Sequence, residues 1–173
     1  IAHALEAKGI GLRKCSRDEN VRIFQREAQG VITGELGVGL VQDDDRRLAA
    51  IRDRIAEAAG RAGRRAEDVR LIAVSKTHPV EAVLAAAGAG QLDFGENKVQ
   101  EALQKISQAT DTRLRWHLIG HLQSNKAKKA GSGAFRFVHA IDSADLLEQV
   151  DRAAGAAGVS LDVLVQVDLA LEA

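Results

Sequence analysis

The sequence predicts an α/β domain built from parallel βα units. Short apolar segments rich in β-branched residues alternate with amphipathic segments of helical period from about residue 45 onward. This alternation is typical of a parallel sheet whose strands are joined by helices. Both an open doubly wound sheet and a (β/α)8 TIM-type barrel have this pattern. No glycine fingerprint follows the first strand, because Ser75–His78 contains no Gly, which counts against a dinucleotide-binding open sheet.

We therefore expect a barrel. A complete one takes about 250 residues, so a chain of 173 residues accounts for about its first five βα units. The expected strands are Val69–Ser75, Leu92–Gly95, Arg115–Gly120, Phe135–Ile141 and Leu161–Leu169. The expected helices are 46–59, Pro79–Gly88, 97–108, 124–130 and the segment after Ser143.

Local signals set the expected helix ends. Asp45 and Ser143 are capping residues, and Pro79 suits a first helical turn. Periodicity predicts that Ala58 and Leu84 face the core, and it predicts an exposed Glu101–Lys105 pair.

The first 44 residues differ from the rest. They contain Gly30, Gly34, Gly37 and Gly39 and show no sustained period. Residues 31–33 and 38–41 predict a weak hairpin, and 2–8 a helical turn or two. We therefore divide the chain into an unassigned segment, 1–44, and a partial barrel, 45–173. By itself the partial barrel would leave an open strand edge, which isolated proteins rarely tolerate.

Composition excludes several classes of protein. Basic and acidic residues balance at 24 each, and aromatic residues make up 3% of the chain. Nucleic-acid binders usually show a basic face and stacking rings, so we expect no nucleic-acid partner. The sequence has no apolar stretch of membrane-spanning length and no secretory signal, and its single Cys15 cannot form an internal disulfide. These features predict a cytoplasmic protein without a membrane partner. We also expect a monomer or a weak dimer.

Lys76 is the leading candidate for chemistry. It follows the apolar run Leu71–Ser75 and precedes Thr77 and Pro79. Ligands of parallel α/β proteins bind at the carboxyl ends of the strands. An amine partly shielded from water there is available as a nucleophile towards an aldehyde. A lysine in an ordinary surface loop is the alternative.

Two further candidates follow the next strands. Asn97 offers a donor and an acceptor to a ring substituent, or else it caps the following helix. His117 either points into the barrel or is a core histidine with its hydrogen bonds satisfied. His121 is expected to be exposed in a loop, and Lys126, Lys128 and Lys129 either attract phosphate or form a solvated helix face. No metal-ligand spacing and no Gly-x-Ser-x-Gly elbow is present.

Three motifs together resemble the pyridoxal phosphate homeostasis protein (YggS) family. They are LIAVSKTHP at Leu71–Pro79, FGENKVQE at Phe94–Glu101 and WHLIGHLQSNK at Trp116–Lys126. Looser likeness continues at Phe137–Ser143 and Val163–Ala173, so that the resemblance covers about residues 46–173. Lys98, Leu118 and Ala130 depart from residues that are frequent in the family.

The resemblance implies a barrel like the N-terminal domain of alanine racemase. It also implies that Lys76 holds pyridoxal 5′-phosphate as an internal aldimine, with Asn97 beside the cofactor ring and His117 as a further cofactor-binding candidate. In the family, a Ser/Gly phosphate segment and an arginine lie in the last three βα units, beyond the part that this chain matches.

The function implied is intracellular vitamin B6 homeostasis, in which the cofactor is bound, buffered and handed to apo-enzymes that require it. This reading makes the protein a carrier without an established reaction. One alternative is a racemase-like enzyme that uses pyridoxal phosphate, and another is an interaction module that binds a polyanion.

Overall fold

A single parallel sheet forms the centre of the molecule. The computed structural model describes residues 21–23, 31–35 and 41–166. Within them the sheet has seven strands in the order β1-β7-β6-β5-β4-β3-β2, and every neighbouring pair is parallel. The strands are β1 (Val21–Ile23), β2 (Val31–Glu35), β3 (Arg70–Val74), β4 (Asp93–Glu96), β5 (Arg115–Leu118), β6 (Phe137–Ile141) and β7 (Leu161–Val165).

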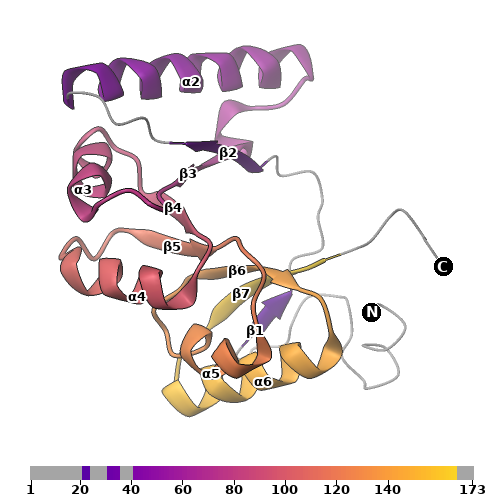
Figure 1. The fold of residues 1–173 in the computed structure, drawn as a ribbon. Coiled ribbons are helices and arrows are strands. Elements are labelled where there is room, and N and C mark those ends of the chain that lie inside the picture. Colours follow the sequence, from indigo (N-terminus) through magenta and orange to yellow (C-terminus); the bar gives the residue numbers. More distant parts are fainter. Residues whose placement is uncertain (1–20, 24–30, 36–40, 167–173) are drawn as a thin grey trace.

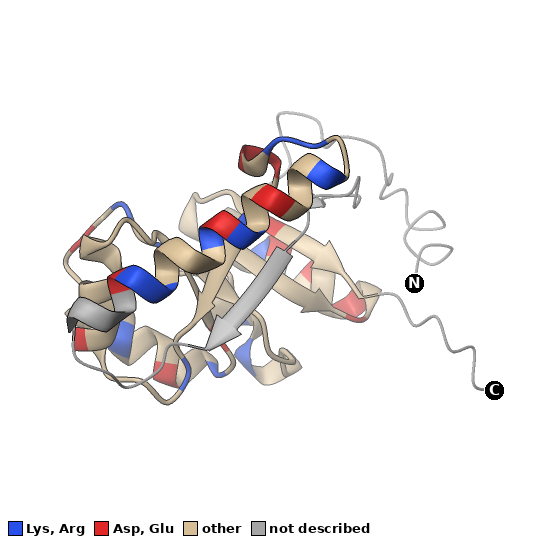
Figure 2. Ribbon diagram, turned by 90° about the horizontal axis from the view of Figure 1, so that it is seen from above, with Lys and Arg blue, Asp and Glu red and all other residues tan. Residues whose placement is uncertain are grey.

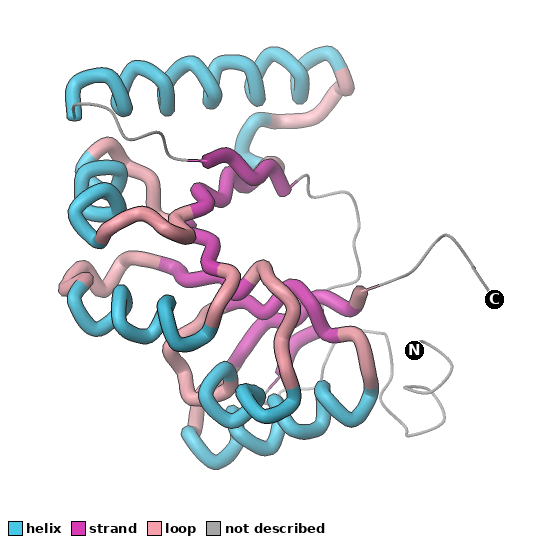
Figure 3. Tube along the Cα trace, in the orientation of Figure 1, coloured by secondary structure: helices cyan, strands magenta, loops and turns pink. Residues whose placement is uncertain are grey.

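The described helices form an outer layer along one side of this sheet (Figures 1 and 3). They are α2 (Val41–Arg61), η1 (Ala66–Asp68), α3 (Val80–Gly88), α4 (Val99–Gln108), η2 (Ser124–Lys126), α5 (Ala127–Ala130) and α6 (Ala144–Ala157). From β3 to β7 the strands lie side by side in chain order, so every crossover advances in the same direction. A doubly wound sheet would instead reverse direction and carry helices on both faces. The winding therefore confirms the barrel expectation, as a partial barrel wall.

Two strands from the first 44 residues occupy the edges of the sheet. Val31–Glu35 pairs in parallel with β3, and Val21–Ile23 pairs in parallel with β7. The 31–35 strand of the predicted hairpin thus pairs with β3, and Val41, the last residue of the predicted second strand, begins a helix. Residues 38–40 of that hairpin, and the helical turns predicted at 2–8, lie outside the described residues. Residues 45–173 alone would leave two edges of the sheet open, and each edge carries one of these added strands. An open edge offers a row of unpaired backbone donors and acceptors, which the added strand satisfies.

Helix α2 is longer than its sequence pattern indicated. It begins at Val41, so Asp45 lies inside the helix and is not its cap. Its buried residues are Leu48, Ile55 and Ala59, whereas Ala58 is exposed. Charged residues cover the outward side of α2 (Figure 2). The buried positions thus have the spacing i, i+7 and i+11, and the last of them is one position away from the expected Ala58.

The shorter helices agree more closely with their local signals. Ser143 Oγ accepts a hydrogen bond from the Leu146 backbone N–H at 3.3 Å, which confirms the predicted cap of α6. Helix α3 ends at Gly88 as expected. Leu84 is 40% exposed, so its predicted core position is wrong, and α3 instead buries Val83 and Ala87, together with Ala86.

The two faces of the sheet have different chemistry. The face beneath the helices carries the apolar core, to which the strands contribute Phe94, Trp116, Leu118, Val138 and Val163. Because successive side chains in a strand alternate between faces, the register places Asp93, Arg115, His117 and Phe137 on the opposite, concave face. Burial of the large apolar side chains, worth about 1.5–3 kcal/mol each, therefore holds the helices to the wall, while the concave face holds polar groups.

Candidate functional site

Lys76 lies just beyond the carboxyl end of β3, as predicted. It occupies a turn and is half-buried. The loops after β3, β4 and β5 are adjacent there, because Ser75 N–H donates to Gly95 O at 2.9 Å and Ile119 N–H donates to Glu96 O at 2.9 Å. The lysine is therefore at the rim of the barrel wall, where parallel α/β folds bind ligands.

The backbone on both sides of Lys76 is held by α4. Lys105 Nζ donates to Ser75 O at 2.6 Å, and the Thr77 N–H donates to Glu101 Oε1 at 2.9 Å. Thr77 has φ of 65°, in the left-handed region that a β-branched residue seldom adopts. The segment around the lysine is thus fixed by specific partners and has one strained residue.

Lys105 and Glu96 form a buried ion pair beneath this segment. Their side chains are 7% and 0% exposed, and Nζ lies 2.5 Å from Glu96 Oε1. Ser75 Oγ donates to the same carboxylate oxygen at 2.6 Å. The predicted exposed Glu101–Lys105 pair is therefore wrong. Lys105 turns towards Glu96 at the end of β4, because a buried carboxylate needs a charged partner more than an exposed carboxylate does. Glu101 turns towards the backbone that follows β3.

Asn97 lies in the loop between β4 and α4 and is exposed. Lys98 occupies the N-cap position of α4, and no side chain caps this helix, so Asn97 is not the helix cap. The Asn97 backbone packs against Gly120, where an added Cβ would lie 2.5 Å from Asn97 O. A glycine at 120 is thus required for the β4 and β5 loops to meet.

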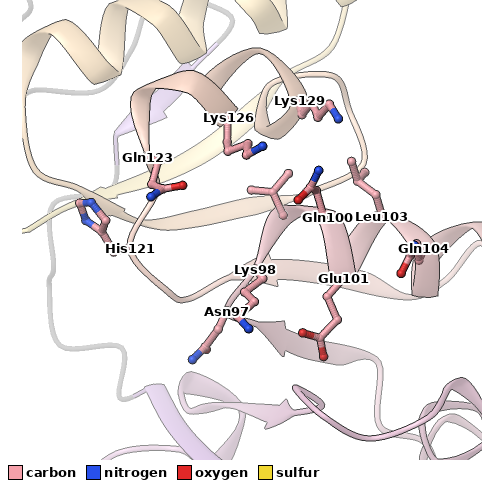
Figure 4. Close-up of a pocket in the computed structure, with 11 residues that line it drawn as sticks. Asn97, Lys98, Gln100, Glu101, Leu103, Gln104, His121, Gln123, Lys126 and Lys129 are labelled. Atoms are coloured by element: carbon pink, nitrogen blue, oxygen red, sulfur yellow. The ribbon is translucent and has the colours of Figure 1, made fainter.

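Figure 4 shows a pocket of about 1010 Å³ at this rim. Asn97 and Lys98 approach it from the start of α4, and Lys126 and Lys129 approach it from η2 and α5. Lys76 is not among the residues that line it. The structure therefore brings the loops that carry Lys76 and Asn97 together, and Asn97 lines this pocket whereas Lys76 does not.

His117 lies on the concave face, 1% exposed. Its ring nitrogens contact Asp93 Oδ1 at 2.8 Å and His139 Nε2 at 2.9 Å, and its ring stacks on Phe137 at 4.4 Å. The side chain therefore faces the barrel interior, and both of its ring nitrogens also have hydrogen-bond partners. The two alternatives that the sequence offered for His117 thus apply together. His121 is exposed, as expected, and lies 3.4 Å from Asp142.

Electrostatics fix the protonation of this network. Burial by itself would raise the pKa of Asp93, but hydrogen bonds from His117 and Arg115 outweigh it and lower that pKa to about 2. Burial lowers the pKa of His117, and the hydrogen bond to Asp93 opposes this only in part. Nε2–H of a neutral His117 donates to Asp93, which leaves Nδ1 to accept from His139. The network is thus a neutral histidine held by a carboxylate.

Sequence reasoning missed Glu96, Lys105 and Asp93. Asp93 lies inside the predicted strand Leu92–Gly95 and Glu96 directly follows it. A charged residue at such a buried position is a signal that could have found both. Lys105 carried no such signal, because the helical pattern assigned it to the exposed face.

The described residues contain no cluster of three or more potential metal-ligating side chains. Among the described helices, none is both long and apolar enough to cross a membrane.

Comparison with known proteins assigns this fold and these motifs to a family. Residues 47–172 match the model of the alanine racemase N-terminal domain. The chain is 41% identical over 128 residues to the pyridoxal phosphate homeostasis protein of Escherichia coli K12, and 42% identical over 126 residues to that of Pseudomonas aeruginosa. These matches cover 72% and 73% of the chain but 54% of each relative. The chain thus spans about half the length of the curated relatives it matches.

The solved structures agree. PipY of Synechococcus elongatus, determined with PLP bound, is 45% identical with a TM-score of 0.63, over 75% of this chain and 56% of that one. The same protein without PLP gives a TM-score of 0.63 over 72% of this chain and 54% of that one. The chain therefore belongs to the alanine racemase N-terminal domain family, and over about half their length it is similar to proteins named pyridoxal phosphate homeostasis protein.

Proposed function

We propose that this chain belongs to a pyridoxal 5′-phosphate carrier of intracellular vitamin B6 homeostasis, which holds the cofactor as a Schiff base on Lys76. The observation that carries the proposal is the half-buried Lys76 at the end of β3, in a chain that is 41% identical over 128 residues to a relative named for this role. The bound cofactor of PipY supports the same ligand.

The residues present fit part of such a ligand. A Schiff base forms when a neutral amine adds to the aldehyde carbon and one water molecule leaves, and this step needs no metal. Lys76 supplies the amine. Asn97, exposed on the adjacent loop, supplies an amide for a ring substituent. His117 forms part of the floor of the concave face. It does not offer a free ring nitrogen to the cofactor, because both of its ring nitrogens have partners.

This engagement of His117 favours a carrier over a racemase-like enzyme. Racemisation needs an acid–base group that exchanges a proton with the substrate. The nitrogens of His117 instead contact Asp93 and His139. Reversible storage of a reactive aldehyde needs only the lysine and a surface that orients the ring.

The remaining assignments follow from this role. The carrier acts in the cytoplasm, as a monomer or weak dimer, and gives the cofactor to apo-enzymes that need it. Residues 45–173 form the cofactor-binding part of the barrel, and 1–44 contribute the two edge strands.

The experiment is covalent trapping. The protein is incubated with pyridoxal phosphate, reduced with borohydride and analysed by peptide mass spectrometry. The modification is expected to concentrate on Lys76, to be lost at that position in Lys76→Arg, and to be unaffected by Lys128→Arg, which changes an exposed lysine. Modification spread evenly over exposed lysines, without preference for Lys76, would contradict the proposal.

A further inference from the structure

We propose that Glu101 and Lys105 of α4 are positioning residues that set the direction in which Lys76 presents its amine. This inference rests on the proposed function, in which Lys76 is the residue that takes the aldehyde. Neither residue touches the ligand in this scheme. They act through the backbone on either side of the lysine.

Lys105 and Glu101 each hold one of the two peptide units that flank Lys76. The carbonyl of Ser75 belongs to the peptide unit before Lys76 and accepts from Lys105 Nζ at 2.6 Å. The N–H of Thr77 belongs to the peptide unit after Lys76 and donates to Glu101 Oε1 at 2.9 Å. Glu101 and Lys105 are four residues apart and therefore lie on the same face of α4. One helical turn thus holds both peptide units of the lysine.

Thr77 explains why such a hold is needed. Its φ of 65° is sterically disfavoured for a residue with a branched Cβ. Strained backbone of this kind persists where the surroundings over-determine it, and it often occurs at ligand sites. A carboxylate that accepts from the Thr77 N–H provides a charge-assisted hydrogen bond to maintain it. The Thr77 hydroxyl also donates to Lys76 O at 2.6 Å.

The same network links the lysine to the Asn97 loop. Lys105 is paired with Glu96, and Glu96 also accepts from Ser75 Oγ at 2.6 Å. Glu96 directly precedes Asn97 in the chain, and the β4–α4 loop leads into the helix that carries both positioning residues. A movement of α4 would therefore shift the lysine segment and the asparagine together.

This arrangement predicts a specific kinetic effect. Displacement of a reacting group by about 1 Å can cost up to about a hundredfold in rate. Loss of the Glu101 contact frees the Thr77 peptide, so the amine samples directions that miss the aldehyde. The rate of bond formation at Lys76 should fall while the fold remains intact, because Glu101 is only half-buried.

The test compares Glu101→Ala with Glu101→Gln, whose amide oxygen can still accept from Thr77 N–H. Gln104→Ala is the matched control, an exposed side chain on the same helix. The first measurement needs no cofactor: amide hydrogen exchange at Thr77, followed by NMR. A hydrogen bond to a charged group is strong enough that Glu101→Ala should accelerate this exchange about tenfold or more. Glu101→Gln should restore most of the protection, and Gln104→Ala should match the wild type.

The second measurement is the rate of borohydride-trapped modification at Lys76 by pyridoxal phosphate. It should fall about tenfold in Glu101→Ala and recover in Glu101→Gln. If the wild type is not modified at Lys76, the proposed function itself fails. If the wild type is modified but Glu101→Ala reacts at the same rate, or leaves Thr77 exchange unchanged, the positioning role is overturned.

Discussion

Strand β4 carries two buried carboxylates whose surroundings differ. Asp93 begins the strand on the concave face, whereas Glu96 ends it on the face beneath α4. Asp93 is bound by His117 and by Arg115, whose side chain is 44% exposed. Glu96 is bound by Lys105, which is 7% exposed, and by Ser75.

The difference separates two roles. The Asp93 network is open to solvent on the side of Arg115, whose guanidinium stays charged. The Glu96 pair is sealed, and Glu96 Oε2 has no hydrogen-bond partner in the described part of the chain. A sealed pair adds little net stability compared with apolar packing but is costly to break. We therefore interpret the amino end of β4 as a partly solvated network and its carboxyl end as a sealed pair that holds the Lys76 segment in position.

Breaking the sealed pair should have the largest effect. Lys105→Met leaves Glu96 buried without its cation, and we expect a loss of about 3–5 kcal/mol in the free energy of unfolding. Adding Glu96→Gln removes the stranded charge, so the double variant should recover part of the loss. Urea denaturation measures both. Lys128→Met, at an exposed position, should stay within about 0.5 kcal/mol of the wild type. Losses that simply add in the double variant would refute the coupling.

Asp93→Asn should cost less, about 1–3 kcal/mol, because the asparagine oxygen can still accept from His117 while its amide faces Arg115. The pKa of Asp93 in the folded state, about 2, is below its usual value, so its stabilisation is present above about pH 4. That stabilisation is lost as the pH falls through 2. The wild type should therefore lose its advantage over Asp93→Asn between pH 5 and pH 2 in urea titrations. A constant difference over this range would show that the carboxylate charge does not matter.

His117 should add a pH dependence at milder acidity. Burial lowers its pKa, so below about 6.5 the unfolded chain binds a proton that the folded chain does not. Stability should thus fall as the pH is lowered from 6.5, with a slope of up to about 1.4 kcal/mol per pH unit. His117→Gln should flatten this slope, and His121→Gln, at an exposed position, should preserve it. Equal slopes in the wild type and His117→Gln would contradict the assignment of a neutral histidine.

The smallest effect is expected at Thr77. Glycine would relieve the left-handed strain, which costs the folded state about 1–2 kcal/mol. Its greater conformational freedom would also stabilise the unfolded chain by about 0.4–1 kcal/mol. Thr77→Gly should therefore raise the free energy of unfolding by between about 0 and 1.6 kcal/mol, measured by thermal denaturation. A clear destabilisation would mean that Thr77 is held for stability and not for positioning.

The sequence was most reliable where a signal is local. Ser143 was identified as a cap from its own position, and Lys76 from the end of an apolar run and its motif. Leu84 and Lys105 were misplaced because periodicity assigns a residue to a helix face without knowing what packs there. The pairing of 31–35 was misassigned for a related reason, since its partner is a strand almost 40 residues later in the chain.

By itself, then, the sequence determined the order of strands and helices, the family and the lysine at the strand end, because these depend on short-range propensity and on motifs. Only the tertiary structure decided that two early strands cover the sheet edges, that Glu96 selects Lys105 and that α4 holds the peptide units of Lys76. These depend on which groups lose water together, and a buried charge or an open strand edge takes its partner from whatever part of the chain folding brings beside it.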